Sequence, residues 1–374
     1  MATRLTHAAA SAKQLAVATV VFIFIFALAR YAWISVVEYL EGSKPTPPPA
    51  TNVLYQVLPK LPSDRGIPTS GLRIRLNTPT GAPPIPAYNK PTVPVYRYLT
   101  RTNNFNYIIN SQKIGQAFNL LDPSGARTSD REYTLTDVQN DIQMIINTEY
   151  FHYKYLKNNI PLYLPVERGS TISGEEAIST ALGYIQRTSE YLLTTSGAAE
   201  FESESTFWYR DLNGTTTEAI SARDANITSV SLRRKDLQTI PFVTDSLANQ
   251  NIIFEFTQER AVSGGAATGR PRLISAEVKY WPVDQTSLSE NALYPIRDIS
   301  TAYNDLLAGK GFATSEIKAN ATYEIENAYL AYYEPYNYYA YVVPVWVFEG
   351  AILGETNSIF QAFVPAIAKG FIAE

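Results

Sequence analysis

The chain has 374 residues, of which 45% are hydrophobic and 18% are charged, and its formal net charge is −4. This composition indicates a globular protein, because a chain of this length and hydrophobic content can bury cores of ordinary domain size. The small negative charge excludes the basic field with which proteins bind nucleic acid, so we expect no nucleic-acid partner. The absence of cysteine excludes disulfides and thiolate metal sites.

The first predicted element is an almost uninterrupted apolar stretch from Gln14 to Val37, broken only by Arg30. A helix of this length spans roughly 36 Å and can cross a hydrocarbon core of about 30 Å. Cations precede the stretch and acidic residues follow it, which places the N-terminus in the cytoplasm. We therefore expect a cytoplasmic tail at 1–13, a transmembrane helix at 14–37 that contacts the lipid bilayer, and an extracytoplasmic body. The predicted localisation is the cell membrane, with a single pass.

A cleaved signal peptide is the competing interpretation of this stretch. Its apolar core would run from Leu15 to Phe26, and Ala27-Leu28-Ala29 has the small-x-small form of a cleavage site. Tyr31 and Trp33 extend the apolar pattern beyond that site and suit a membrane interface, which favours the uncleaved helix.

A proline-rich segment follows, and thirteen of the 23 prolines fall between Pro45 and Pro94. Polyproline is extended and stiff, so residues 38–94 are predicted to form a stalk. The alternation of Leu72, Ile74 and Leu76 and the stretch 93–99 indicate short strands, so part of this stalk is expected to pair with the body.

Helix signals recur along the body. Thr136 is a candidate N-cap for a helix carrying Val138, Ile142, Ile145 and Ile146, and Ser173-Gly174-Glu175-Glu176 matches the capping box of a second helix. A third helix is predicted from Asp298 to its C′ glycine, Gly309. Strands are predicted at 252–256, 274–280, 322–333, 338–348 and 359–364.

These elements predict an α+β fold with an N-terminal transmembrane helix, a proline-rich stalk and two mixed helix and antiparallel-sheet modules. The modules are expected at 95–270 and 271–374, because each contains a helix followed by aromatic-rich strands.

The second module carries a resemblance to a known family. Tyr294-Pro295-Ile296, the helix 302–307 ending at Gly309, the strand 328–333 and the stretch Tyr341 to Gly350 with its Pro-Val-Trp sequence are similar to the end of the extracytoplasmic regulators YycH and YycI. The resemblance implies a PepSY-like α+β module and action by protein contact. It covers roughly residues 294–365, and it assigns no functional residue.

The strand predicted at 338–348 has two apolar faces, so both require cover. Pro344 lacks a ladder donor, which predicts an edge strand or a bulge at that point. Trp346 is predicted to pack against the helix that contains Ala302, Tyr303 and Leu306. The alternative is that Trp346 and its neighbouring tyrosines form an exposed contact patch.

Groups able to perform catalysis are scarce. The chain has two histidines, His7 and His152, and no cysteine, so neither a metal cluster nor a Cys/His pair can be built from them. We therefore expect no enzyme, no cofactor and no metal site. An enzyme working with carboxylates alone is the least favoured alternative.

The predicted function is binding. The first hypothesis is a regulatory or scaffolding subunit of an envelope complex with a protein partner. The second is a binding module for cell-wall glycan or peptide that uses exposed tyrosines, because seven tyrosines lie between Tyr329 and Tyr341. Cross-strand packing is the competing explanation of these tyrosines. The candidate binding surface consists of Tyr332, Tyr333, Tyr336, Tyr338, Tyr339 and Trp346.

Overall fold

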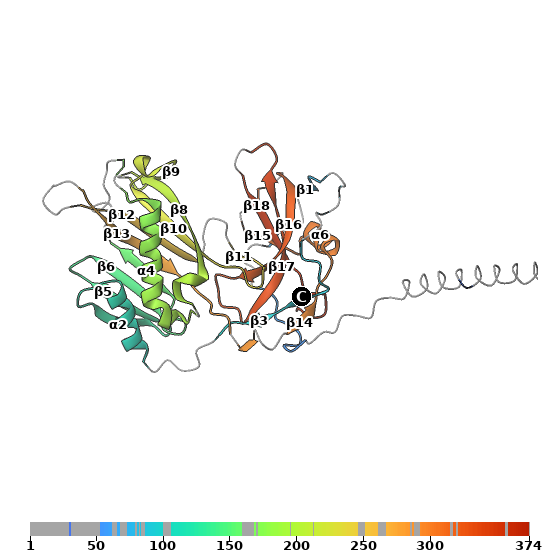
Figure 1. The fold of residues 1–374 in the computed structure, drawn as a ribbon, viewed down its shortest axis with the longest axis horizontal. Helices are drawn as coiled ribbons and strands as arrows, with labels where there is room; N and C mark the ends of the chain where they lie inside the picture. Colours follow the sequence, from blue (N-terminus) through green and yellow to red (C-terminus); the bar gives the residue numbers. More distant parts are fainter. Residues whose placement is uncertain are drawn as a thin grey trace, which may run out of the picture. The chain divides into compact units, whose positions relative to one another are not determined.

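The structure is a computed structural model. It describes Arg30 and residues 53–373, with gaps at 62–65, 68–72, 79–80, 82, 84–86, 100–105, 159–167, 170, 195, 212, 246–250, 261–266, 285, 288–291, 315–316, 319–320 and 356–357. The chain separates into a unit formed by Met1–Ala50 and a unit formed by Thr51–Glu374, and the description below concerns the second unit (Figure 1).

A nine-stranded antiparallel sheet with the order β4-β5-β6-β7-β13-β12-β10-β8-β9 occupies the middle of the sequence. Its strands are β4 (Ser124–Ser129), β5 (Glu132–Asp137), β6 (Ile142–Asn147), β7 (Tyr153–Lys157), β8 (Phe201–Arg210), β9 (Thr216–Ala219), β10 (Ile227–Arg234), β12 (Ile252–Arg260) and β13 (Ala267–Val278). The short helices η1 (Gly197–Glu200) and η2 (Ala222–Asp224) lie between its strands in the sequence.

One face of this sheet is covered by α4 (Gly174–Leu192), with α2 (Tyr107–Ala117) beside it (Figure 1). The capping box predicted at the start of α4 is confirmed, because the Ser173 hydroxyl accepts a hydrogen bond from the backbone N–H of Glu176 at 3.2 Å. Ala177, Ala181 and Ile185 recur on one side of the helix and are fully buried in the core against the sheet.

A seven-stranded sheet with the order β1-β16-β17-β18-β15 forms the second part of the body, with β11 paired to β16 and β3 paired to β17. Its strands are β1 (Arg73–Leu76), β3 (Tyr96–Arg97), β11 (Phe242–Thr244), β15 (Phe312–Ala313), β16 (Thr322–Glu334), β17 (Tyr341–Ile352) and β18 (Phe360–Pro365), and β2 (Thr92–Pro94) pairs separately with β14 (Leu293–Pro295). The predicted strands at 252–256, 274–280, 322–333, 338–348 and 359–364 are confirmed as β12, β13, β16, β17 and β18.

The helix predicted from Asp298 is confirmed as α6 (Ile299–Leu307). The Asp298 carboxylate accepts from the backbone N–H of Thr301 at 2.9 Å, and Gly309 follows the helix with a φ of +72°. Trp346 is 2% exposed and belongs to the same core as Ala302 and Leu306, as predicted.

The described residues of the proline-rich segment pack against the seven-stranded sheet. Leu58 and Val93 are completely buried, Leu58 forms a bridge with Ile372, and β1 runs parallel to β16. The boundary predicted between residues 270 and 271 falls inside β13.

The predicted α+β class is wrong, because the described residues form eighteen strands and three α-helices, so the protein is mostly β. The helix predicted from Thr136 is one source of this error, since residues 132–147 form the β5–β6 hairpin. The Asp137 carboxylate accepts from the backbone N–H groups of Asn140 and Leu121, which stabilises a turn in place of a helix start. Val138 consequently lies 81% exposed in that turn.

The predicted membrane topology is also corrected. Residues 14–37, apart from Arg30, lie outside the described residues. Among the residues that the structure describes, no helix combines the length and the apolar character needed to span a bilayer. The predicted transmembrane helix, single pass and cell-membrane localisation thus find no support in the described part of the chain.

Pro344 lies neither on an edge strand nor at a bulge, contrary to the prediction. It pairs with Tyr332 of β16, while the other side of β17 changes partner from β3, at Tyr341 and Val342, to β18, from Val345 onward. The Pro344 carbonyl accepts from the Ala366 N–H on the β18 side at 3.0 Å, and the proline nitrogen faces the same side. The N–H group that Pro344 lacks would therefore point to the side on which the neighbour of β17 changes from β3 to β18.

Candidate functional site

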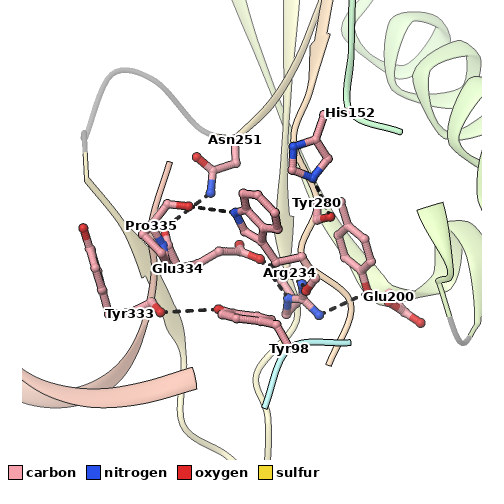
Figure 2. Close-up of polar contacts among 10 residues, drawn as sticks. Tyr98, His152, Glu200, Arg234, Asn251, Tyr280, Tyr333, Glu334 and Pro335 are labelled. Atoms are coloured by element: carbon pink, nitrogen blue, oxygen red, sulfur yellow. Dashed lines mark hydrogen bonds and ion pairs between the residues drawn. The ribbon is translucent and has the colours of Figure 1, made fainter. Parts of the chain in front are cut away.

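A buried ion pair connects the two sheets (Figure 2). Arg234 ends β10 of the nine-stranded sheet, and Glu334 ends β16 of the seven-stranded sheet. The guanidinium donates to Glu334 Oε1 from Nη2 at 2.8 Å and from Nε at 3.3 Å. Only 8% of the Arg234 side chain and 7% of the Glu334 side chain are exposed, so water screens this pair little.

Two aromatic residues, Tyr280 and Trp281, make further contacts with the Arg234 guanidinium. Its Nη1 donates to the Tyr280 hydroxyl at 3.1 Å, its Nη2 donates to the Trp281 carbonyl, and the guanidinium lies 4.3 Å from the centre of the Tyr280 ring. The Tyr280 hydroxyl in turn donates to the Glu200 carboxylate. Burial lowers the pKa of Arg234, but Tyr280 and Glu334 outweigh that effect and hold the pKa above its ordinary value.

We call the contacts among Arg234, Glu334, Tyr280, Trp281 and Glu200 the inter-sheet junction. Further hydrogen bonds reinforce this junction. Trp281 Nε1 donates to the Pro335 carbonyl at 2.9 Å, Tyr98 donates to the Tyr333 carbonyl, and His152 Nε2 donates to the Tyr280 carbonyl at 2.9 Å (Figure 2). Burial lowers the pKa of His152 to about 4, so this histidine is neutral near pH 7. Each polar side chain that is labelled in Figure 2 has a hydrogen-bond partner. This favours a structural role for the junction in joining the two sheets.

The tyrosines of the predicted binding surface separate into two groups. Tyr332, Tyr333, Tyr339 and Trp346 are buried, with exposures of 0%, 2%, 7% and 2%. Tyr336 and Tyr338 are exposed at 42% and 36%.

Both exposed tyrosines pack against neighbouring side chains. Tyr338 stacks on Tyr150 with ring centres 5.0 Å apart, and the Lys279 ammonium covers the ring of Tyr336 at 2.8 Å. One face of each exposed ring is therefore already occupied. Among the described residues, no group of three His, Asp or Glu side chains could hold a metal ion.

A cavity of about 550 Å³ lies elsewhere in the body and has a different character. Its described lining comes from three separate parts of the chain: Lys60, Leu61 and Gly66; Arg297, Asp305 and 309–312; and Pro365, Ile367, Lys369, Ile372 and Ala373. Its charged side chains are Lys60, Arg297, Asp305, Lys310 and Lys369. Among the described lining residues, four cations and one carboxylate give this basic cavity a formal charge of +3.

Asp305 is the point at which three of these cations converge. Its Oδ2 accepts from Arg297 Nη1 at 2.6 Å, and its Oδ1 lies 3.3 Å from Lys310 Nζ and 3.4 Å from Lys369 Nζ. Burial raises the pKa of Asp305, but the hydrogen bond from Lys310 and the charges of Arg297 and Lys369 outweigh this effect and hold the pKa below its ordinary value. The carboxylate is therefore ionised at neutral pH.

Arg297 is nine-tenths buried in the wall of the basic cavity, with 10% of its side chain exposed. Its Nε is buried and has no hydrogen-bond partner among the described residues. Burial lowers the pKa of Arg297, and Asp305 opposes that effect. Lys310 and Lys369 are by contrast 59% and 54% exposed, so their ammonium groups are accessible to a ligand.

The loop after α6 fixes the position of Lys310. Gly309 takes the left-handed conformation that ends the helix, and the backbone N–H of Lys310 donates to the Asp305 carbonyl at 2.9 Å. A Cβ on Gly311 would lie 2.7 Å from the Phe363 carbonyl, so only glycine allows this approach. No local pattern in the sequence indicates the basic cavity, because its charged residues are not clustered along the chain.

The comparisons with known proteins assign no function. No protein-family model matches the chain, and no curated protein matches it. One similar solved structure is that of an uncharacterized protein from Eubacterium rectale, with 13% identity, coverage of 80% of this chain and 90% of that chain, and a TM-score of 0.39. A match at this level carries no argument, and the resemblance to YycH and YycI stays a prediction.

Proposed function

We propose that the protein acts by binding, and that its binding site is the basic cavity. The ligand is a small molecule with an anionic group and an apolar part. One observation carries this proposal: the described lining of a cavity of about 550 Å³ carries four cations, and three of them converge on its carboxylate, Asp305. This volume is in the range of about 300–1,000 Å³ that ligand pockets occupy.

The walls of the basic cavity account for the apolar part of the ligand. Pro365, Ile372 and Ala373 line it, and each keeps part of its surface exposed. An apolar substituent beside these side chains would gain roughly 25 cal/mol for each Å² removed from water.

The chemistry of the lining residues supports binding over catalysis. The described lining residues include no hydroxyl, thiol or imidazole group, so they offer no nucleophile and base pair for acyl transfer. Asp305 is the only carboxylate in the part of the lining that the structure describes; three cations hold it and its pKa is lowered, which makes it a poor general base. We therefore favour a binding protein without a cofactor.

A regulatory or scaffolding role with a protein partner remains a prediction from the sequence. The basic cavity is compatible with this role, because a regulatory subunit can use such a cavity to sense a ligand. The alternative of glycan or peptide binding through exposed tyrosines receives less support. Of the six residues predicted for it, only Tyr336 and Tyr338 are exposed by a third or more.

The proposed function can be tested by calorimetric titration of the full-length protein with octanoate, inorganic phosphate and octylammonium. We expect the two anions to bind and the cation not to bind. Lys369→Met should weaken anion binding, because it removes one of the accessible charges of the cavity. Lys318→Met is the matched control, since Lys318 is 57% exposed and pairs with Glu355. Binding of octylammonium, equal effects of both substitutions, or no binding of either anion would contradict the proposal.

A further inference from the structure

We propose that the ligand of the basic cavity is a soluble phosphate monoester with a short apolar substituent. This inference rests on the proposed anion-binding function and narrows it to one class of ligand. A phosphate monoester carries a charge of about −1.5 to −2 near pH 7 and three strong acceptor oxygens. The described lining residues of the basic cavity carry a formal charge of +3, so a singly charged anion would leave most of that charge unbalanced.

The donors of the basic cavity exceed what Asp305 can use. Each lysine ammonium has three donors, and Lys310 and Lys369 each direct one contact to the same Asp305 oxygen. Their remaining donors are available to a ligand at the point where the cations converge. A phosphoryl group with three acceptor oxygens matches this surplus better than a carboxylate with two oxygens.

The apolar wall explains why free phosphate is not the favoured ligand. Inorganic phosphate would use the charged side chains of the cavity and leave the exposed surface of Pro365, Ile372 and Ala373 in contact with water. An ester substituent extends from the phosphate and can cover these side chains. The charged and the apolar lining residues together therefore indicate an amphipathic phosphate ester.

Three probes separate the contributions of charge and apolar surface in calorimetric titrations of the full-length protein. Octyl phosphate and octyl sulfate have the same chain and the same tetrahedral head, but the sulfate carries only one charge. We expect octyl phosphate to bind about tenfold more tightly than octyl sulfate at pH 8, as one additional charge-assisted contact would give. We also expect it to bind more tightly than inorganic phosphate.

The pH dependence provides an independent readout. The second pKa of a phosphate monoester is about 6. At pH 5.5 the advantage of octyl phosphate over octyl sulfate should therefore largely disappear. Lys310→Met and Lys369→Met should reduce the same advantage at pH 8, whereas Lys318→Met should leave it unchanged.

The outcomes distinguish this inference from the proposed function. Equal affinities for octyl phosphate and octyl sulfate at pH 8 would contradict the preference for a doubly charged ligand but would leave the proposed anion binding intact. Equal binding of octyl phosphate and inorganic phosphate would overturn the apolar substituent. No binding of octyl phosphate, octyl sulfate or octanoate would overturn both proposals.

Phosphatidate presents the same head group from a lipid, so vesicles of phosphatidylcholine with and without phosphatidate test the source of the ligand. Sedimentation of the protein with phosphatidate vesicles, together with no binding of octyl phosphate, would contradict a soluble ligand. Binding of octyl phosphate without sedimentation supports it.

Discussion

Replacement of Arg234 by methionine tests whether the inter-sheet junction holds the two sheets together. Arg234→Met retains most of the side-chain volume but leaves the Glu334 carboxylate buried and without its cation. The hydroxyl of Tyr280 and the carbonyl of Trp281 lose a donor at the same time. Loss of one partner of a buried ion pair reduces stability by about 3–5 kcal/mol, because the remaining charge is left uncompensated.

Arg233 provides a matched control on the same strand. It pairs with Glu202, and 48% and 50% of the two side chains are exposed. An exposed pair of this kind contributes about 0–1 kcal/mol, so Arg233→Met should change stability little. The chemical change is identical in the two variants, and only the burial of the ion pair differs.

Urea unfolding, followed by tryptophan fluorescence, measures both variants. We expect the free energy of unfolding to fall by about 3 kcal/mol more for Arg234→Met than for Arg233→Met. The double variant Arg234→Met/Glu334→Leu should be more stable than Arg234→Met, because it leaves no unpaired buried charge. Equal losses for Arg234→Met and Arg233→Met would refute the structural role assigned to the junction.

Local signals in the sequence located several elements of the fold correctly. The capping box at Ser173 and the helix between Asp298 and Gly309 depend on residues within one or two turns, so they can be seen in the sequence. Strands β16, β17 and β18 could be predicted in the same way, because each is an apolar segment of the sequence. Trp346 could be assigned to the core because both faces of its strand are apolar.

Other elements gave misleading signals or none. Val138, Ile142 and Ile145 have helical spacing, yet burial alternates at Ile142, Met144 and Ile146, as in a strand. β4 is the edge strand of its sheet and is exposed along its whole length, so it carries no apolar alternation. These strands account for part of the β content that the predicted α+β class omitted.

The sites depend on contacts between distant residues and could not be predicted. Arg234 and Glu334 are 100 positions apart, and each would ordinarily be assigned to the surface by its charge. The basic cavity combines the proline-rich segment, the loop after α6 and the residues after β18, which no sequence pattern connects.

Three further predictions test the cores and the buried histidine. Trp346→Ala should reduce stability by about 3–5 kcal/mol in urea unfolding, because Trp346 is 2% exposed and its Nε1 donates to the Arg297 carbonyl at 3.0 Å. Gly183→Ala should raise the melting temperature with a gain of about 1 kcal/mol, because Gly183 lies inside α4 and a Cβ there meets nothing within 4 Å; a loss of stability would contradict the free space at that position. The pH dependence of stability should report on His152, whose pKa falls from 6.5 to about 4 on burial. The unfolded chain binds a proton at this site between these two values while the folded chain does not, so protonation favours unfolding. The contribution of His152 is therefore complete above pH 6.5 and is lost as the pH falls through about 4. Its magnitude is about 3 kcal/mol at roughly 1.4 kcal/mol for each pKa unit. Urea unfolding at pH 7.5 and pH 4.5 measures this loss, and His152→Gln, which cannot titrate, should lose less stability over the same interval. An equal loss in both proteins would show that other groups, and not the buried imidazole, set the acid sensitivity.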